Sequence, residues 1–424
     1  MPVVALQNLG CSKNQVDGQR MLACLIEAGF TATQDFSRAE IIIVNTCAFI
    51  QEATREAIHE ILEMVVYKRE GRCKTLAVAG CFSERFSEEA KKDFPEVDLW
   101  LGVHDWPRVL KRVFNTSGAP SFTRTLSPPF ATQFLKISEG CSHRCSFCAI
   151  PAIRGAFASR PEKDIVAEAR WLESQGVKEC ILVSQDTSHY GKDRGSSLAR
   201  LLEALLAKTE FPWIRLMYLH PRLVNDDFLR LVAREKRILP YFDVPLQHIN
   251  DDILMSMKRR PLSRGIRDLI CRIRAIVPEA AIRTSFIVGY PGETARRFEE
   301  LLSFVSWARF ERCGVFPFSP EEGTPACAMH KRPKNATVSS RCDELMAVQE
   351  GISREICLSR VGATLDVMVD CRTESGFEAR TVWDAPEVDG TVLVEKGNPA
   401  VGDIVPVRIV SSREYDLIGH AETR

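Results

Sequence analysis

Residues 139–148 read EGCSHRCSFC, and this stretch brings Cys141, Cys145 and Cys148 within eight residues of one another. It follows an apolar run, TQFLKIS, which is typical of a buried β-strand. A closed tetrahedral metal site takes four ligands, so three closely spaced thiols leave one coordination position open. We therefore expect a metal centre with a free position directly after a strand.

Two kinds of metal centre fit this spacing. The pattern C-x3-C-x2-C provides thiolates for three irons of a 4Fe–4S cluster and leaves the fourth iron open, whereas electron-transfer ferredoxins use four cysteines for each cluster. Zinc is the alternative. His143 is too close to the cysteines to complete a tetrahedron with them comfortably, but His220 or His248, after later predicted strands, could complete it.

The composition of the chain limits its number of domains, its partners and its cellular compartment. Its 424 residues are enough for two or three domains. Lys plus Arg and Asp plus Glu both number 56, so the net charge of zero gives no argument for nucleic acid or an anionic membrane. The amino terminus has no signal-peptide pattern, and no apolar run reaches the roughly 18 residues of a membrane span. We expect a soluble cytoplasmic protein without a membrane partner, in which fifteen cysteines favour metal or redox chemistry over disulfides.

Residues 2–100 repeat a strand-then-helix unit three times. The apolar runs VVALQNLG, IIIVNT and KTLAVAG lead into Cys11, Cys47 and Cys81, and a helical pattern follows each cysteine. This alternation favours a parallel sheet with helices packed on it. Because the carboxyl ends of parallel strands lie along one edge, we expect these cysteines to converge there, where helix N-termini favour thiolates. The alternative is three unrelated structural cysteines.

A second alternation follows residues 115–130, whose sequence NTSGAPSFTRTLSPPF is typical of a linker. The expected strands are TQFLKISE, ECILVSQD, WIRLMYL, YFDVPLQ, IRTSFIVG and CGVFPF, with helical patterns between them. Such units favour a partial or full (β/α) barrel, in which catalytic groups lie at the carboxyl ends of the strands. EGCSHRCSFC occupies that position after the first strand.

The carboxyl-terminal part changes character. A long helical pattern from about Val338 to Cys357 precedes short β runs broken by Gly, Asp, Asn and Pro, which predict a small antiparallel barrel of OB-like type. The predicted fold class is therefore α/β with an additional small β-barrel. The predicted domains are an α/β domain at 1–114, a linker at 115–130, a (β/α) domain at 131–357 and a β-barrel domain at 358–424.

The cysteine loop, with Phe147 directly before Cys148, resembles the radical S-adenosylmethionine (SAM) enzymes. In these enzymes SAM binds the open iron of a 4Fe–4S cluster and is cleaved to the 5′-deoxyadenosyl radical. The order of a three-cysteine domain (NLGCSKN, VNTC, AGC), a radical SAM domain and a small β domain resembling TRAM is that of the methylthiotransferase family. The resemblance covers essentially the whole chain.

This resemblance implies SAM and two 4Fe–4S clusters as cofactors. One cluster is expected on Cys141, Cys145 and Cys148; a second, which carries the sulfur to be inserted, is expected on Cys11, Cys47 and Cys81. One SAM then methylates this sulfur, and another supplies the radical that removes hydrogen from an unactivated substrate carbon. The chemistry needs no acid–base pair, and none is predicted.

The predicted SAM contacts rest on resemblance and on strand-end position. Phe147 is expected near the adenine, while Gln185, Gln247 and Arg283 are expected near the ribose or methionine part. The alternative for these polar residues is a role as hydrogen-bonded scaffold groups.

Within the family, several stretches resemble the RimO-type branch, which acts on an aspartate of the twelfth small-subunit ribosomal protein. They are SQDTSHYGKD at 184–193, YFDVPLQHI at 241–249, MKRRP at 257–261 and CSFCAIPAIRG at 145–155. Residues 358–424 contain 12 acidic and 7 basic residues, a net charge of −5, which suits a basic protein better than an RNA backbone. The sequence departs from the family at Gly18 and Gln19, where Ser-Glu is common; the expected ligand set is unaffected.

Two other functions stay open. The first is tRNA adenosine methylthiolation, of MiaB-like type, by the same machinery. The second is a zinc-stabilised RNA-binding scaffold that uses the terminal OB-like barrel. The favoured interpretation also requires a reducing electron donor and a sulfur source, whereas nucleic acid is not required for the chemistry.

Overall fold

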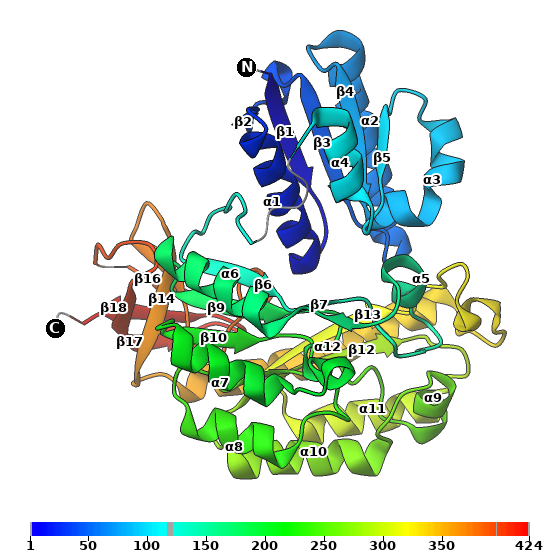
Figure 1. The fold of residues 1–424 in the computed structure, drawn as a ribbon. Helices are drawn as coiled ribbons and strands as arrows, with labels where there is room; N and C mark the ends of the chain where they lie inside the picture. Colours follow the sequence, from blue (N-terminus) through cyan, green and yellow to red (C-terminus); the bar gives the residue numbers. More distant parts are fainter. Residues whose placement is uncertain (1, 117–121, 396, 423–424) are drawn as a thin grey trace.

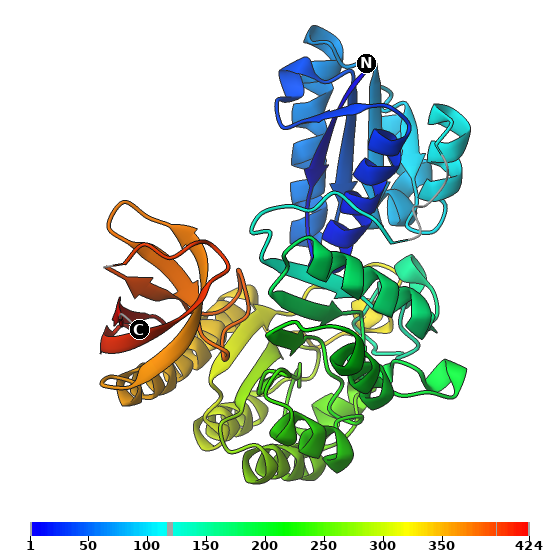
Figure 2. The same cartoon turned by 60° about the vertical axis from the view of Figure 1, so that its left-hand side comes forward.

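The computed structural model describes residues 2–116, 122–395 and 397–422. An amino-terminal α/β domain stands on a central domain, and a small β-barrel lies against another side of the central domain (Figures 1 and 2). The predicted fold class is confirmed.

The amino-terminal domain is built on a parallel sheet in the order β2-β1-β3-β4-β5. Its strands are β1 (Val3–Asn8), β2 (Thr31–Thr33), β3 (Ile41–Thr46), β4 (Thr75–Gly80) and β5 (Leu99–Leu101). Its helices are α1 (Ser12–Glu27), α2 (Gln51–Glu70), α3 (Cys81–Asp93) and α4 (Trp106–Phe114). The three predicted strands are present in the middle of the sheet, and the short edge strands β2 and β5 were not predicted.

Alternating side chains of β3 explain why helices cover both faces of this sheet. Ile42 and Val44 pack with α2 and α3, whereas Ile41 and Ile43 pack with α1 and α4. All four side chains are buried. A strand that is apolar on both faces is expected at the centre of a parallel sheet.

The central domain is a partial barrel of parallel strands. Strands β10-β9-β6 form one sheet and β11-β12-β13 form another, and a bridge between Ile214 and Ile238 joins them. The strands are β6 (Thr132–Lys136), β9 (Glu179–Val183), β10 (Trp213–Leu216), β11 (Tyr241–Asp243), β12 (Ala281–Val288) and β13 (Arg312–Pro317). Since β6 and β13 are the outer strands, the predicted barrel is of the partial kind.

Helices cover the outside of this partial barrel (Figure 1). They are α6 (Glu162–Ser174), α7 (Leu198–Lys208), α8 (Asp226–Arg234), α9 (Asp251–Ser256), α10 (Ser263–Ile276), α11 (Ala295–Ala308) and α12 (Asn335–Ser359). The short helix α5 (Ile150–Arg154) lies instead between the central and amino-terminal domains, against α3 (Figure 1). Smaller elements are the pair β7 (Ser138–Glu139) and β8 (Ala158–Ser159) and the 3₁₀ turns η1 (Phe36–Arg38), η2 (Thr187–His189), η3 (Lys192–Arg194) and η4 (Pro325–Ala328). Among the described residues, no helix combines the length and the apolar character that crossing a bilayer requires.

The carboxyl-terminal domain is a closed barrel in the order β14-β15-β16-β18-β17. Its strands are β14 (Thr364–Arg372), β15 (Phe377–Arg380), β16 (Val392–Val394), β17 (Ile404–Ser412) and β18 (Leu417–Ala421). Neighbouring strands pair antiparallel as expected, except that β16 and β18 pair in parallel.

The barrel docks on the amino ends of the central strands through buried ion pairs. Arg380 contacts Glu179, the first residue of β9, at 2.9 Å. Arg312, the first residue of β13, pairs with Asp384. Asp389 accepts a hydrogen bond from Tyr241, the first residue of β11, at 2.6 Å.

The predicted linker at 115–130 is only partly described, since residues 117–121 lie outside the described part of the chain. Beyond them the segment is anchored, because the buried guanidinium of Arg124 lies 3.1 Å from Glu168 of α6. The domain boundaries at 114, 130 and 357 stay predictions.

Candidate active site

The two sets of cysteines meet in one cavity of about 320 Å³ between the amino-terminal sheet and the central barrel. Its lining includes Cys11, Cys47, Cys81, Cys141, Cys145 and Cys148. The first three come from the carboxyl edge of the amino-terminal sheet, and the others come from the loop between β7 and α5. The prediction that the amino-terminal cysteines converge is confirmed in position, and the structure adds that the two sets share one cavity.

Close packing of the strand ends brings the amino-terminal cysteines together. Gly10 precedes Cys11 with a φ of 85°, and a Cβ built on it would lie 2.5 Å from the Cβ of Cys47. Gly80 precedes Cys81 with a φ of 90°, and its Cβ would lie 2.4 Å from the carbonyl oxygen of Thr46. Only glycine tolerates both the left-handed backbone and these short approaches.

The second cysteine loop is held by backbone hydrogen bonds to its surroundings. The amide of Cys141 donates to the carbonyl of Gly155 at 3.1 Å, and the amide of Ser146 donates to the carbonyl of Met257 at 3.0 Å. The hydroxyl groups of Ser146 and Tyr290 lie 2.8 Å apart. The thiols of this loop are therefore presented by a fixed backbone.

Burial and nearby cations act in opposite directions on the thiols. Burial raises the pKa of Cys47 and of Cys148 to about 12. Burial also acts to raise the pKa of Cys11, but the charges of Lys13 and Arg154 outweigh it and the pKa lies below its usual range. A bound metal centre stabilises thiolates, so metal binding to the buried thiols would release protons.

The spacing of the thiols argues against the zinc alternative. A zinc ion about 2.3 Å from each sulfur holds its ligand sulfurs about 3.8 Å apart. In the described part of the chain, no group of three metal-ligating atoms within 4.8 Å of one another includes a cysteine. His248 is buried beside Glu293 and does not line the cavity. Soft thiolate donors with a wider spacing fit a cluster in which each thiolate binds a different iron.

Arg154 connects the two cysteine sets. Its side chain is buried, and its Nε donates to Sγ of Cys81 at 3.3 Å. Its other nitrogens contact Asp17 of α1 at 3.2 Å and Glu139 of β7 at 3.1 Å. These carboxylates raise the pKa of Arg154 despite its burial, so the guanidinium stays charged. Sequence reasoning missed this residue, because no spacing pattern links it to Cys81.

Three of the four predicted SAM contacts line the cavity: Phe147, Gln185 and Gln247. Gln185 donates to Glu139 at 3.0 Å. Gln247 has a φ of 74°, a left-handed conformation that is uncommon for residues other than glycine. Its amide donates to the carbonyl of Ser285, and its own carbonyl accepts from the amide of Ile287, each at 2.8 Å.

Arg283 is not brought to the cavity. It is the third residue of β12, which continues to Val288, so it lies far from the carboxyl end of the strand. Its guanidinium pairs with Asp243 at 3.1 Å and with Asp389 of the terminal barrel at 3.3 Å. The sequence argument expected this strand at 282–289, close to its observed range, but it treated Arg283 as a strand-end residue although Arg283 lies near the amino end of the strand.

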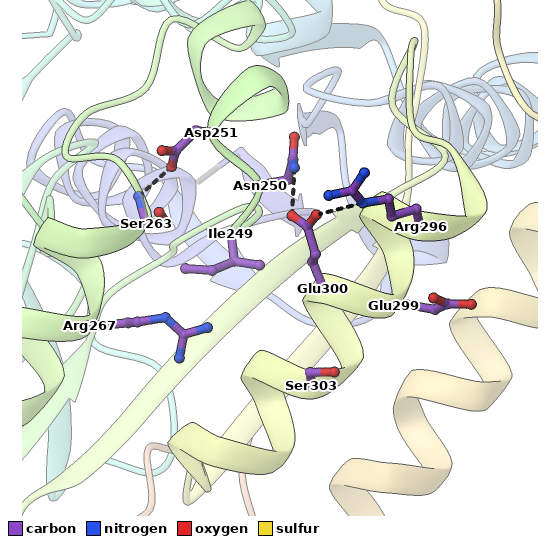
Figure 3. Close-up of a pocket in the computed structure, with 9 residues that line it drawn as sticks. All are labelled: Ile249, Asn250, Asp251, Ser263, Arg267, Arg296, Glu299, Glu300 and Ser303. Carbon is purple, nitrogen blue, oxygen red and sulfur yellow. Dashed lines mark hydrogen bonds and ion pairs between the residues drawn. The ribbon is translucent and has the colours of Figure 1, made fainter.

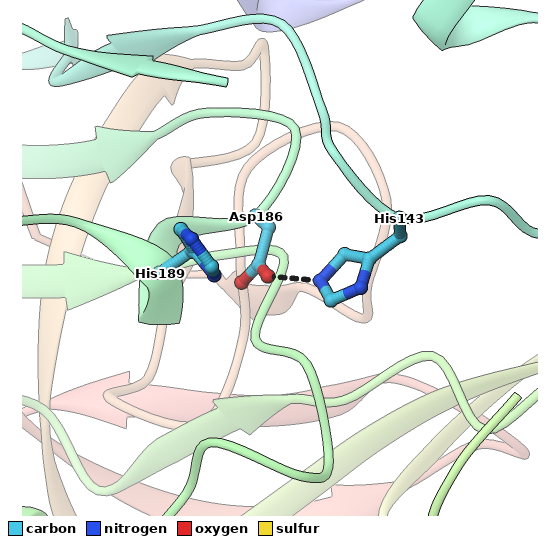
Figure 4. Close-up of side chains that lie close together, drawn as sticks. All are labelled: His143, Asp186 and His189. Atoms are coloured by element: carbon cyan, nitrogen blue, oxygen red, sulfur yellow. Dashed lines mark hydrogen bonds and ion pairs between the residues drawn. The ribbon is translucent and has the colours of Figure 1, made fainter. Parts of the chain in front are cut away.

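The structure adds polar residues beyond the predicted cluster ligands and SAM contacts, and His220, which the sequence offered only as a zinc ligand, lines the cavity among them. His143 lies 2.6 Å from Asp186, and Figure 4 shows this contact with His189 nearby. The ligating atoms of these three residues lie within 4.8 Å of one another. The 2.6 Å separation is that of a direct hydrogen bond, which fixes the ring of His143. The ring of His220 stacks on it at 4.1 Å, and burial lowers the pKa of His220 to about 3.

A second cavity, of about 590 Å³, lies away from the cysteines. Its lining comes from the segments around α9, α10 and α11, and Figure 3 shows several of its polar groups paired with one another. Asn250 donates to Glu300 at 2.6 Å, and Asp251 accepts from the amide of Ser263 at 2.8 Å. Although this cavity is larger, none of its lining residues is a cysteine. The cysteine cavity is therefore the candidate active site.

Comparisons with known proteins agree with this organisation. Residues 3–102 match the family described as "Uncharacterized protein family UPF0004", residues 135–305 match the radical SAM superfamily, and residues 361–421 match the TRAM domain. Among solved structures, the radical SAM methyltransferase TsrM from Kitasatospora setae aligns with a TM-score of 0.56 at 14% identity, covering 77% of this chain and 74% of that one. Identity this low shows a shared fold alone.

Fold and matched domains thus define a radical SAM enzyme with a TRAM domain. Curated relatives narrow the class. The chain is 42% identical to ribosomal protein uS12 methylthiotransferase RimO of Pelobacter propionicus, over 99% of this chain and 98% of the relative. It is 41% identical to the protein of the same name from Geobacter sulfurreducens, over 98% of each chain. The chain belongs to the RimO family of methylthiotransferases, and it is a transferase; enzymes of this kind use SAM and two 4Fe–4S clusters.

Proposed function

We propose that this enzyme adds a methylthio group to the β-carbon of an aspartate in the twelfth protein of the small ribosomal subunit. The observation that carries the proposal is the meeting of two three-cysteine sets in one cavity. A radical formed at one set can act on a substrate carbon that lies next to sulfur held at the other set. The curated relatives, which are named for this ribosomal protein, support the choice of substrate.

The residues that would hold the two clusters are the two cysteine sets. Cys141, Cys145 and Cys148 leave one iron for SAM, and Cys11, Cys47 and Cys81 leave one iron for the sulfur to be inserted. Bound together, these groups supply radical formation and the methylthio group. The chain binds and orients them: Arg154 contacts Cys81, and Arg259 donates to Cys145 at 3.8 Å. We also propose that Phe147, Gln185 and Gln247 contact SAM.

Charge supports a protein substrate over tRNA. The net charge of −5 on residues 358–424 suits a basic ribosomal protein and repels a phosphate backbone. We propose that the enzyme works in the cytoplasm, where ribosomes assemble, with a cellular reductant that supplies one electron for each SAM cleaved and a separate source of sulfur.

The direct experiment compares a strain that lacks the gene with its parent. Mass spectrometry of the ribosomal protein should show a methylthio group on one aspartate only in the parent, and a plasmid copy should restore it. Loss of a methylthio group from tRNA, with the ribosomal protein unchanged, would contradict the proposal and support the MiaB-like alternative.

Iron content tests the two-cluster arrangement. Anaerobic reconstitution should give about eight irons for each chain, because three thiolates hold each four-iron cluster. Removing Cys11, Cys47 and Cys81 together should leave about four. A wild-type content near four that this triple variant does not change would refute the second cluster, and zinc in a colourless protein would support the scaffold alternative.

A further inference from the structure

Lys13 brings a buried positive charge into the cysteine cavity. It lies in the first turn of α1, two residues after Cys11, and its side chain lines the cavity. The residue is only 7% exposed. Its Nζ lies 3.3 Å from the ring centroid of Tyr218, which follows β10 of the central barrel. The lysine therefore reaches from the amino-terminal domain to the carboxyl ends of the central strands.

Tyr218 is held rigidly beneath this lysine. Its φ of 62° is unusual for a bulky residue. The amide of Tyr218 donates to Asp243 at 2.9 Å, and its carbonyl accepts from the amide of Thr187 at 3.0 Å. Strained backbone that is fixed from both sides is typical of functional sites. The tyrosine ring thus provides a firm support for the ammonium group of Lys13.

Other cations of the cavity already have partners. Arg154 pairs with Asp17 and Glu139, and the side chain of Arg259 donates to the carbonyl of Pro245. Within the described residues, by contrast, no carboxylate lies within 4.0 Å of the ammonium group of Lys13. Besides Tyr218, the charge of Lys13 interacts with the thiol of Cys11, two residues away. Because that thiol is itself an expected cluster ligand, a buried ammonium group without a carboxylate partner points to an anion that arrives with a ligand.

We propose that Lys13 binds the side-chain carboxylate of the substrate aspartate. This inference rests on the proposed function and names the residue that recognises the substrate group. A carboxylate paired with Lys13 would place the neighbouring β-carbon inside the cavity that both cysteine sets line. Lys13 is then a specificity-determining residue, since an adenine base has no carboxylate to offer it.

The test measures the pairing directly. Reconstituted enzyme is titrated with two fluorescent peptides from the modified region of the ribosomal protein, one with the target aspartate and one with asparagine at that position. The wild type should bind the aspartate peptide about 10- to 100-fold more tightly, as expected for a hydrogen-bonded charge pair. Lys13→Met should reduce this ratio to near one, and Lys13→Arg should recover part of it.

Lys192→Met is the matched control. Lys192 is an exposed lysine of η3, and its removal takes away the same charge without touching the cavity lining, so the peptide ratio should stay at the wild-type value. Iron content and the electron paramagnetic resonance spectrum of every variant establish that the clusters are intact. If Lys13→Met loses iron, Lys13→Gln takes its place, and the same ratio decides.

The outcomes separate the two claims. A wild type that neither binds nor methylthiolates the aspartate peptide overturns the proposed function. A wild type that does both, together with a Lys13→Met ratio equal to that of the wild type, overturns the role of Lys13 alone. An unchanged ratio with an altered cluster spectrum would also overturn it, because Lys13 would then only balance the charge of the cluster on Cys11.

Discussion

Arg154 shows how a single side chain links two halves of this active site. Its guanidinium contacts a thiol of the amino-terminal domain and carboxylates from both domains, all away from water. The planar group has several donors in a fixed geometry, which a lysine cannot reproduce. Arg154 therefore sets the position of Cys81 relative to the loop that carries Cys141.

Replacing Arg154 with Met should destabilise the protein by about 1–3 kcal/mol, because Asp17 and Glu139 would keep Lys136 but lose their hydrogen bonds to the buried guanidinium. Thermal unfolding measures the loss. Arg108→Met, at an exposed position of α4, is the control and should change the melting temperature little. An Arg154→Met protein as stable as this control would contradict the linking role.

Among single residues, the sequence predicted the position of the cysteines better than it predicted contacts between distant side chains. The cysteines could be placed because the carboxyl ends of parallel strands share an edge. Arg283 could not, because it lies near the amino end of β12, where Asp243 and Asp389 pair with its guanidinium. The contact between Lys13 and Tyr218 joins residues of different domains, and the local sequence around neither residue predicts it.

Among the elements, the turn from β1 into α1 controls the amino-terminal cysteine set. Gly10 forms this turn, with a left-handed φ and almost no room beside Cys47. Gly29, after α1, has a similar φ of 92°, but a Cβ there would meet no atom within 4 Å. Both glycines have a left-handed φ, but only at Gly10 would an added Cβ meet neighbouring atoms.

Gly10→Ala should therefore lower the iron content from about eight towards about four irons for each chain, since the methyl group would push Cys47 away from Cys11. Gly29→Ala is the matched control, which costs about 1 kcal/mol of backbone strain and should keep the full iron content. Equal iron in the two variants would show that the close approach at Gly10 is not needed for cluster binding.

Long apolar runs made the main helices and strands predictable, whereas some strands of three residues were not predicted. Helix α2 follows Cys47 as its helical pattern predicted, and each central strand that was expected is present. Strands β2 and β5 have only three residues each, too few to show a period. The parallel pairing of β16 with β18 follows from how the barrel closes, which local sequence does not encode.

Across the whole molecule, Glu179 is the centre of the contact between the terminal barrel and the central domain. It is fully buried between Arg215, at 2.7 Å, and Arg380, at 2.9 Å. Burial acts to raise the pKa of Glu179, but the two arginines outweigh it and lower the pKa from 4.5 to about 2. The ionised form therefore stabilises the docked barrel at neutral pH.

The sign of the pH effect follows from this lowered pKa. The contribution of Glu179, about 3 kcal/mol, is complete above pH 4.5 and is lost as the pH falls towards 2. Glu179→Gln should destabilise the protein at pH 7, and its difference from the wild type should shrink below pH 4.5. Because burial raises the pKa of nearby Asp370, which acts in the opposite direction, the difference between variants is the quantity to measure.

Chemical unfolding from pH 7 to pH 3 provides this difference, and Glu70→Gln at an exposed position of α2 is the control. A constant difference between Glu179→Gln and the wild type over the whole range would show that the charge of Glu179 does not hold the barrel in place.

Because the terminal barrel docks at the amino ends of the central strands, the length of these strands separates it from the cysteine cavity at their carboxyl ends. Strand β12 has eight residues, so its two ends lie about 26 Å apart. Any protein that this barrel captures must span a comparable distance to deliver a side chain to the cysteine cavity at the carboxyl ends of the central strands. A flat surface cannot do so, whereas a protruding loop with about eight extended residues in each of its two arms can. The distance between the barrel and the cysteine cavity thus selects substrates by the length of their protruding segment as well as by the chemistry of the target side chain.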